Sequence, residues 1–276
     1  MKKDQLPPGR RSMFRIAACL GAAAVGGLLA GEQAETPGRG PAAGGPQAAA
    51  APPPKAASYR LRPLAAYAAP ALRRARPPVR ERPFLEVPDM GRAMVLTFDD
   101  GPDPRYTPDI LAILREYGVR AMFFVCGEMA TGNRDLLREM ADDGHVVGNH
   151  TWSHPLVPKL PPSRIRDQLG RTSEVIEKSL GEAPLWYRAP YGAWNKHSFE
   201  IGAELGMEPL GWTLDTLDWT RPGTSTIVRR VLRGAAPGVV VLSHDAGGNR
   251  SQSVAALRRY LPELLYDGYR ITVPRR

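Results

Sequence analysis

Cysteine is nearly absent from this sequence, which has two cysteines, Cys19 and Cys126, among 276 residues. So small a number excludes a disulfide framework and a cysteine-rich metal site. Cys126 directly follows the apolar run 121–125 and has no basic residue close to it in sequence. We therefore interpret Cys126 as a buried structural thiol and not as a reactive one.

Long apolar runs are also lacking. The Ala- and Gly-rich stretch 16–30 is only weakly apolar and is shorter than the about 20 residues that a membrane-spanning helix requires. Basic residues that include Lys2, Lys3, Arg10 and Arg11 precede it, as in a secretory signal, and residues 10–14 (RRSMF) resemble a twin-arginine export signal. We predict that residues 1–30 direct export, so that the protein is secreted or otherwise extracytoplasmic. No single cleavage site stands out, which leaves open an uncleaved anchor that tethers the protein to the membrane or wall.

Excess basic charge is missing from most of the chain. The formal net charge is +9, but residues 1–90 contain 14 Lys/Arg and 6 Asp/Glu, whereas residues 91–276 contain 23 and 22. A nucleic-acid-binding domain needs a basic stripe on its folded part, and the sequence shows none there. We therefore expect no nucleic-acid partner.

The prolines divide the chain into two parts. Half of the 28 prolines fall within residues 1–90, and residues 31–90 are rich in Ala, Pro and Gly. This composition is typical of a disordered, semi-stiff linker without a core. We predict an export signal or signal anchor at 1–30, a linker at 31–90 and one catalytic domain at 91–276, and we expect a monomer.

From residue 94 onward, short apolar runs alternate with amphipathic stretches. Predicted strands cover 94–98, 121–125, 146–148, 185–187, 209–214, 239–242 and 269–273, and predicted helices cover 108–117, 133–143, 161–180, 197–205, 224–232 and 251–266. Continuous apolar strands that alternate with helices indicate a parallel α/β fold. About seven repeats in this length predict a distorted, incomplete (β/α) barrel, with its active site at the carboxyl ends of the strands.

Polar residues gather at those strand ends. The first predicted strand runs into residues 97–102 (TFDDGP), which contain the adjacent carboxylates Asp99 and Asp100. A solvated turn is the alternative interpretation of this segment, because Asp-Gly and Gly-Pro favour turns. Adjacent buried carboxylates repel each other and cost desolvation energy, which argues for function over stability.

Later strand ends add a histidine pair and further polar groups. His150 and His154 are four residues apart, and in a helical turn that spacing places both on one face, where they can hold one cation. The next strand ends contribute residues 187–191 (YRAPY), 215–219 (DTLDW) and 242–245 (LSHD). Polar clusters at five strand ends indicate one shared site.

These groups suit metal-assisted hydrolysis. Two histidines and an aspartate leave positions open on the metal for water and substrate. A second carboxylate can take a proton from the water. A separate histidine, held cationic by a nearby aspartate, can protonate the leaving group. An amide needs that last step most, because its amine is a poor leaving group.

In order and spacing, the segments 97–102, 150–154 (HTWSH), 188–191 (RAPY), 215–219 and 242–244 resemble the five motifs of the polysaccharide deacetylases, carbohydrate esterase family 4, which includes the nodulation chitooligosaccharide deacetylases. The resemblance covers about residues 92–273. It implies removal of acetyl groups from N-acetylated sugars of a polysaccharide substrate, such as peptidoglycan or a chitin-like polymer. It also implies a divalent metal, most often zinc, with cobalt or another transition metal also accepted.

The resemblance implies a role for each motif residue. Asp100, His150 and His154 would hold the metal. Asp99 would be the general base, held by Arg188, and His244 the general acid, tuned by Asp218. The backbone amide of Tyr191 would stabilise the oxyanion. Pro190, Trp219 and Leu242 would line the substrate pocket.

The remaining candidates have simpler interpretations. We interpret His145 as a surface or turn residue and His197 as a structural residue at a helix start. Trp194 is a candidate either for stacking on a sugar or for core packing. Asp103 and Arg105 are candidates either for the groove or for turn formation.

Two other functions stay open on the sequence. A non-catalytic carbohydrate-binding relative would be expected to lack Asp99, a metal ligand or His244, and all are present. An esterase that acts on O-acetyl groups of a xylan-like polymer would carry the same motifs. The export signal favours the cell's own wall as the substrate.

Overall fold

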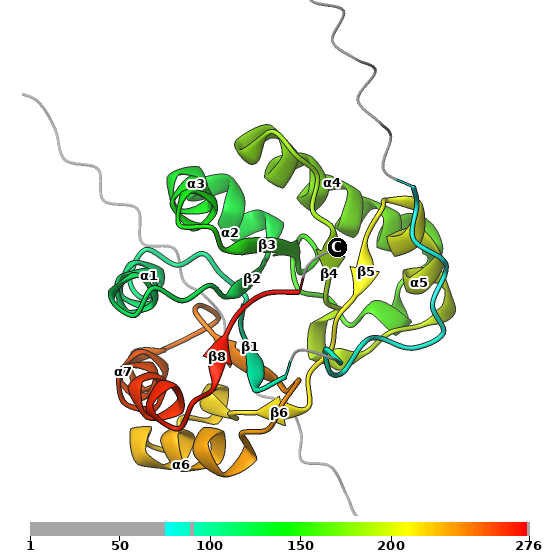
Figure 1. Ribbon diagram of the computed structural model, residues 1–276. Coiled ribbons are helices and arrows are strands. Elements are labelled where there is room, and N and C mark those ends of the chain that lie inside the picture. Colours follow the sequence, from blue (N-terminus) through cyan, green and yellow to red (C-terminus); the bar gives the residue numbers. More distant parts are fainter. Residues whose placement is uncertain (1–74, 89–90, 275–276) are drawn as a thin grey trace, which may run out of the picture. The chain divides into compact units, whose positions relative to one another are not determined.

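The computed structural model describes residues 75–88 and 91–274 (Figure 1). The predicted export signal and the linker up to residue 74 lie outside the described residues. Within the described part, no helix has the length and apolar character needed to cross a membrane.

The strands and helices alternate as the sequence predicts. The strands are β1 (Ala93–Asp99), β2 (Met122–Val125), β3 (Val146–Asn149), β4 (Trp186–Tyr187), β5 (Glu208–Pro209), β6 (Leu214–Asp215), β7 (Val240–His244) and β8 (Arg270–Ile271). The helices are α1 (Thr107–Glu116), α2 (Gly127–Gly132), α3 (Arg134–Asp142), α4 (Pro162–Leu180), α5 (Lys196–Glu204), α6 (Thr224–Gly234) and α7 (Ser251–Tyr266). Short 3-10 turns are η1 (Val157–Lys159), η2 (Pro190–Gly192) and η3 (Asp218–Thr220).

Seven strands form one parallel sheet in the order β5-β4-β3-β2-β1-β7-β6, and β8 pairs with β1 outside this path. The sheet is curled into a half-barrel with helices around it (Figure 1). All seven residues of β1 are buried, as expected of a central parallel strand. The prediction of an incomplete (β/α) barrel of about seven strands is therefore confirmed.

Local sequence explains where the helices begin and end. Helix α1 has Pro108 in its first turn, where the missing N–H costs nothing, and Asp109 beside it favours the positive end of the helix dipole. Helix α4 ends at Gly181, whose φ of 82° closes the helix in the left-handed region. The apolar faces of the helices pack with the sheet into the largest core cluster, which includes Leu111, Phe123 and Leu257.

The predicted strand 209–214 is wrong. Its two ends form separate strands, β5 and β6, at opposite ends of the sheet order. The carbonyl groups of Leu210 and Gly211 in between accept hydrogen bonds from the Arg188 side chain. The carbonyl groups of Leu210 and Gly211 thus bind the buried Arg188 guanidinium and are not part of a strand ladder. Over the same segment the chain crosses from one end of the sheet to the other.

The last part of the predicted linker lies on the domain. We call residues 80–87 the strap. Phe84 forms a parallel bridge with Leu210, beside β5, and Glu86 forms an antiparallel bridge with Val239, beside β7. Figure 1 shows this cyan segment passing α5 and β5. Phe84 and Val87 pack against a core cluster that contains Trp186, so the strap belongs to the folded unit and is not linker.

Candidate active site

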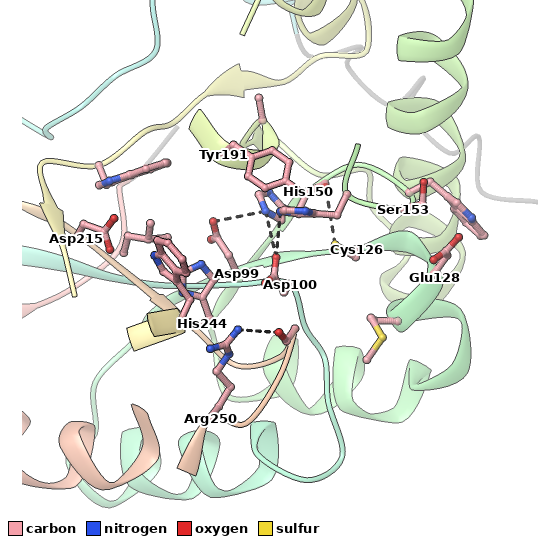
Figure 2. A pocket seen from close by; sticks show the side chains of 18 residues that line it. Asp99, Asp100, Cys126, Glu128, His150, Ser153, Tyr191, Asp215, His244 and Arg250 are labelled. Carbon is pink, nitrogen blue, oxygen red and sulfur yellow. Dashed lines mark hydrogen bonds and ion pairs between the residues drawn. The ribbon is translucent and has the colours of Figure 1, made fainter. Parts of the chain in front are cut away.

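The carboxyl ends of the strands surround a cavity of about 650 Å³. Eight of the predicted site residues line it: Asp99, Asp100, His150, His154, Tyr191, Trp219, Leu242 and His244. Figure 2 shows Asp99, Asp100, His150 and His244 close together in this cavity. Arg188 and Asp218 lie behind it, each bonded to a lining residue.

Asp100, His150 and His154 form a cluster whose ligand atoms all lie within 4.8 Å of one another. Asp100 Oδ1 is 3.5 Å from His150 Nε2 and 3.4 Å from His154 Nε2. The same oxygen is buried and has no hydrogen-bond partner among the described residues. A buried carboxylate oxygen without a partner that faces two imidazoles is the arrangement expected of a cation site.

The protonation states of the cluster also suit a metal. Burial disfavours the charge on Asp100, but His150, His244 and His154 outweigh it and lower the pKa of Asp100 to about 2. Burial lowers the pKa of His154, which favours its neutral form. His150 Nδ1 lies 2.9 Å from the Arg188 carbonyl oxygen, so Nδ1 must donate, which leaves Nε2 as the ring nitrogen that can face a metal. One carboxylate and two imidazoles are a donor set for zinc or a similar transition metal.

The backbone that presents the histidines is not helical. His150 and His154 lie in a loop after β3, and both Thr151 and His154 have positive φ, 70° and 55°. The expected helical turn is therefore wrong, although both rings still reach one site, with centroids 5.0 Å apart. Asp100 also has a positive φ of 78°. Such strained non-glycine residues cluster at functional sites, where the surrounding fold holds them.

Asp99 is bound by a fully buried arginine. Arg188 Nη1 donates to Asp99 Oδ1 at 2.7 Å and to Thr97 Oγ1 at 2.8 Å. Its Nε and Nη2 donate to the carbonyl oxygens of Leu210 and Gly211. Every polar edge of the guanidinium is thus satisfied, which is what a buried charge requires. The predicted Asp99–Arg188 pair is present, and Asp99 Oδ2 remains free of this arginine.

His244 is held by Asp218. His244 Nδ1 lies 2.7 Å from Asp218 Oδ1, the His244 backbone N–H donates to Asp218 Oδ2, and Ser253 donates to the same oxygen. Burial lowers the pKa of His244, but the hydrogen bond and charge of Asp218, with Asp100 and Asp99, outweigh it and raise the pKa to about 9. The predicted pairing of the two residues is therefore present.

The predicted substrate residues differ in exposure. The side chains of Tyr191 and Trp219 are 67% and 56% exposed at the cavity, whereas Leu242 and Pro190 are buried. Tyr191 has a φ of 61°, and its ring packs against His154 with centroids 4.6 Å apart. No hydrogen bond of the described residues is donated by the Tyr191 backbone amide. Pro190 does not line the cavity.

Asp245 is buried, and the sequence motifs assign it no role. Its carboxyl accepts a hydrogen bond from Thr107 at 2.6 Å and lies so close to Gly101 that a Cβ there would be 2.2 Å away. Burial, with the charges of Asp100 and Asp99, raises the pKa of Asp245 to about 7. Its position directly after His244 was the available signal.

The minor candidates resolve as structural. His145 is buried and does not lie on the surface as expected. Its Nδ1 accepts a hydrogen bond from the Ala121 amide, and burial lowers its pKa to about 4. His197 is exposed at the start of α5. Trp194 packs against a core cluster, and Asp103 and Arg105 pair with each other; none of these lines the cavity. Cys126 is buried as predicted, and burial raises the pKa of its thiol.

Comparison with known proteins agrees with this site. The family model "Polysaccharide deacetylase" matches residues 86–210. A peptidoglycan-N-acetylglucosamine deacetylase of Bacillus cereus is 39% identical over 187 residues, which cover 67% of this chain and 87% of the relative. A chitooligosaccharide deacetylase of Bradyrhizobium is 37% identical over 192 residues, 65% of this chain and 88% of the relative. The chain therefore belongs to the polysaccharide deacetylases, carbohydrate esterase family 4, which are hydrolases of carbon–nitrogen bonds.

One of the similar solved structures is that of a pseudoenzyme. A family 4 pseudoenzyme from Bacillus anthracis superposes with a TM-score of 0.64 at 30% identity, over 69% of this chain and 66% of that chain. A shared fold therefore does not establish catalysis by itself. The side chains that line the cavity of this chain, and not its fold, support activity.

Proposed function

We propose that this protein removes N-acetyl groups from N-acetylglucosamine units of a polysaccharide, either peptidoglycan or a chitin-like polymer. One observation carries the proposal: an Asp-His-His cluster shares a cavity with two separately held proton-transfer groups, Asp99 and His244. The names of the relatives support N-acetylglucosamine as the sugar.

Asp100, His150 and His154 would hold a divalent metal, zinc or another transition metal such as cobalt. Such a cation lowers the pKa of water and polarises the acetyl carbonyl. The pseudoenzyme alternative is disfavoured because all three ligand residues, the base and the acid are present and face one another.

Asp99 would accept the proton of the attacking water. Arg188 binds Oδ1, which fixes the carboxylate and leaves Oδ2 to take the proton. Oδ2 lies 3.7 Å from His150 Nε2, so the base sits beside the metal cluster. A base must be within reach of the proton it removes, and this position provides that reach.

His244 would deliver a proton to the departing amine. With a pKa of about 9 in the metal-free chain, the ring is protonated at neutral pH. Asp218 occupies Nδ1, so Nε2 is the donor toward the substrate. Trp219 and Leu242 would surround the acetyl group, and the Tyr191 amide would bind the oxyanion.

We also propose that the protein acts outside the cytoplasm, on the wall or held near it. The basic start and apolar stretch of residues 1–30 support export. Fractionation of the native host tests this location. Recovery of the protein from the cytoplasm alone would contradict it.

Acetate release from a panel of polymers tests the substrate. We expect release from peptidoglycan or chitooligosaccharides in the presence of zinc, with the Asp99→Asn variant as the inactive control. Acetylated xylan separates the O-acetyl esterase alternative. Release from xylan alone would replace the proposed activity, and release from none of the polymers would overturn it.

A further inference from the structure

The strap is hydrogen-bonded to segment 209–211, which also binds Arg188. The Phe84 amide donates to the Pro209 carbonyl at 2.9 Å, and the Gly211 amide donates to the Phe84 carbonyl at 2.7 Å. The segment 209–211 is thus paired along one edge with the strap. Most of the strap, residues 80–85, precedes the part of the chain that the family model matches.

Arg188 uses the carbonyl groups of the same segment. Its Nε donates to Leu210 O at 3.0 Å and its Nη2 to Gly211 O at 2.8 Å. Its Nη1 then donates to Asp99. A continuous series of hydrogen bonds therefore leads from the strap backbone, through segment 209–211 and Arg188, to Asp99.

Side chains fasten the strap at this place. Arg80 makes two hydrogen bonds of 3.0 Å each to Glu208, the first residue of β5. The Phe84 ring packs edge-on against Trp186, with ring centroids 6.2 Å apart, and the Arg80 guanidinium lies over the Phe84 ring. At Gly211 the approach is so close that a Cβ would lie 2.8 Å from Leu85 Cδ2.

Segment 209–211 is held on its other edge by β4, where Pro209 is in register with Tyr187 and the Leu210 amide donates to the Tyr187 carbonyl at 3.0 Å. The strands on either side of it, β5 and β6, have two residues each and lie at the two ends of the sheet order. A fully buried guanidinium requires fixed acceptors, and small displacements of a reacting group are costly for rate. The strap supplies the backbone partners on the edge opposite β4, at Pro209 and Gly211, and so completes the pairing of the segment that carries those acceptors.

We propose that the strap is a positioning element for Asp99, acting through Leu210, Gly211 and Arg188. The inference rests on the proposed function, in which Asp99 is the general base. It predicts that loss of the Phe84 amide lowers kcat while zinc affinity stays unchanged, because Asp100, His150 and His154 lie on other segments.

Two substitutions in the full-length protein isolate that amide. Phe84→Ala removes the ring and keeps the N–H, whereas Phe84→Pro removes both. Leu85→Pro is the matched control, because Leu85 is half exposed and its amide donates no hydrogen bond in the described chain. We expect Phe84→Pro to lower kcat about tenfold below Phe84→Ala. Equal kcat values for these two variants would overturn the inference.

A cycle with Arg188→Lys separates positioning from general destabilisation. Lysine keeps the charge but lacks the fork that reaches Leu210 and Gly211. In that background, Phe84→Pro and Phe84→Ala should differ less than twofold in kcat. A tenfold difference in both backgrounds would show that the strap does not act through Arg188.

One measurement requires neither enzymatic activity nor a fully folded Phe84→Pro variant. The Arg188 Nε–H should be protected from hydrogen exchange in the wild type and in Leu85→Pro, and less protected in Gly211→Ala, with protection restored by Leu85→Ala in the same chain. Unchanged protection in Gly211→Ala would contradict the coupling. Absence of acetate release by the wild type would instead overturn the proposed function and leave this readout intact.

Discussion

Four aspartates near the active site have four different environments. Asp99 is paired with Arg188, Asp100 faces two histidines, Asp218 is bonded to His244, and Asp245 is bonded to Thr107. Different surroundings give chemically identical carboxyl groups different proton affinities. The division between base, ligand, orienting group and buried acid therefore follows from what each side chain contacts.

The role of His244 as leaving-group acid can be tested by substrate choice. His244→Ala should lose at least tenfold more rate on an N-acetyl sugar than on an activated acetyl ester, because a good leaving group needs little protonation. Zinc content should stay unchanged, since His244 lies outside the metal cluster. Equal losses on the two substrates would assign His244 another role.

The pH profile tests Asp218. The negative charge and hydrogen bond of Asp218 raise the pKa of His244 against the effect of burial. Asp218→Asn should therefore lower that pKa and move the high-pH limit of kcat to lower pH. Asp215→Asn is a matched control, because it removes the same charge from the cavity without a hydrogen bond to His244. Equal shifts for both variants would contradict this assignment.

Asp245 should limit stability at neutral pH. Its pKa is 3.8 in an unfolded chain and about 7 in the folded one, so the folded state binds the extra proton between these values. The contribution of Asp245 to stability, measured as wild type minus Asp245→Asn, should become less favourable by roughly 2–4 kcal/mol as pH rises from 4 to 7. Asp245→Asn removes that dependence. Urea unfolding of the metal-free wild type and Asp245→Asn at pH 4 and pH 8 measures the difference in unfolding free energy between them. If Asp245→Asn is no more stable relative to wild type at pH 8 than at pH 4, the prediction is wrong.

At the scale of elements, long periodic segments were predictable and short ones were not. The fully buried β1 and the helices α1 and α4 agree with their apolar patterns within a few residues. Helix α2 was missed because it has six residues and no apolar period. The strap is predicted as linker because it adjoins the proline-rich residues 31–74 and is too short to show an apolar period, whereas its partners Trp186 and Glu208 are far away in sequence.

The site was predictable to the extent that motifs follow strand ends. Asp99, Asp100, His150 and His154 meet because parallel strands end at one edge. The carbonyl groups that hold Arg188 and the burial of Asp245 depend on segments far apart in sequence. No local pattern encodes such tertiary partners.

Strand β3 allows a test of packing. A Cβ at Gly148 would lie 2.7 Å from the Phe124 ring and 3.2 Å from the Trp186 carbonyl oxygen. Gly148→Ala should therefore destabilise the domain by about 1–3 kcal/mol. Gly170→Ala, inside α4 with open space around it, should instead stabilise by about 0.5–1 kcal/mol. Urea unfolding compares them, and the same sign for both would contradict the packing described.

For the whole molecule, the folded domain is nearly neutral and contains the complete site, while the basic charge lies in the first 90 residues. The proposed catalytic residues and the proposed export signal thus lie in different parts of the chain. The domain's activity should not depend on residues 1–74, whereas it should depend on the metal cluster and on Asp99.

Acetate release by this protein should require both a metal at Asp100, His150 and His154 and a base at Asp99. The most direct measurement titrates zinc into the chelated full-length protein and follows acetate release from chitooligosaccharides. Release should rise with bound zinc and saturate at about one zinc per chain, and Asp99→Asn should bind zinc equally while releasing acetate at least a hundredfold more slowly. Full activity of protein verified to be metal-free, or a wild-type rate for Asp99→Asn, would contradict the account.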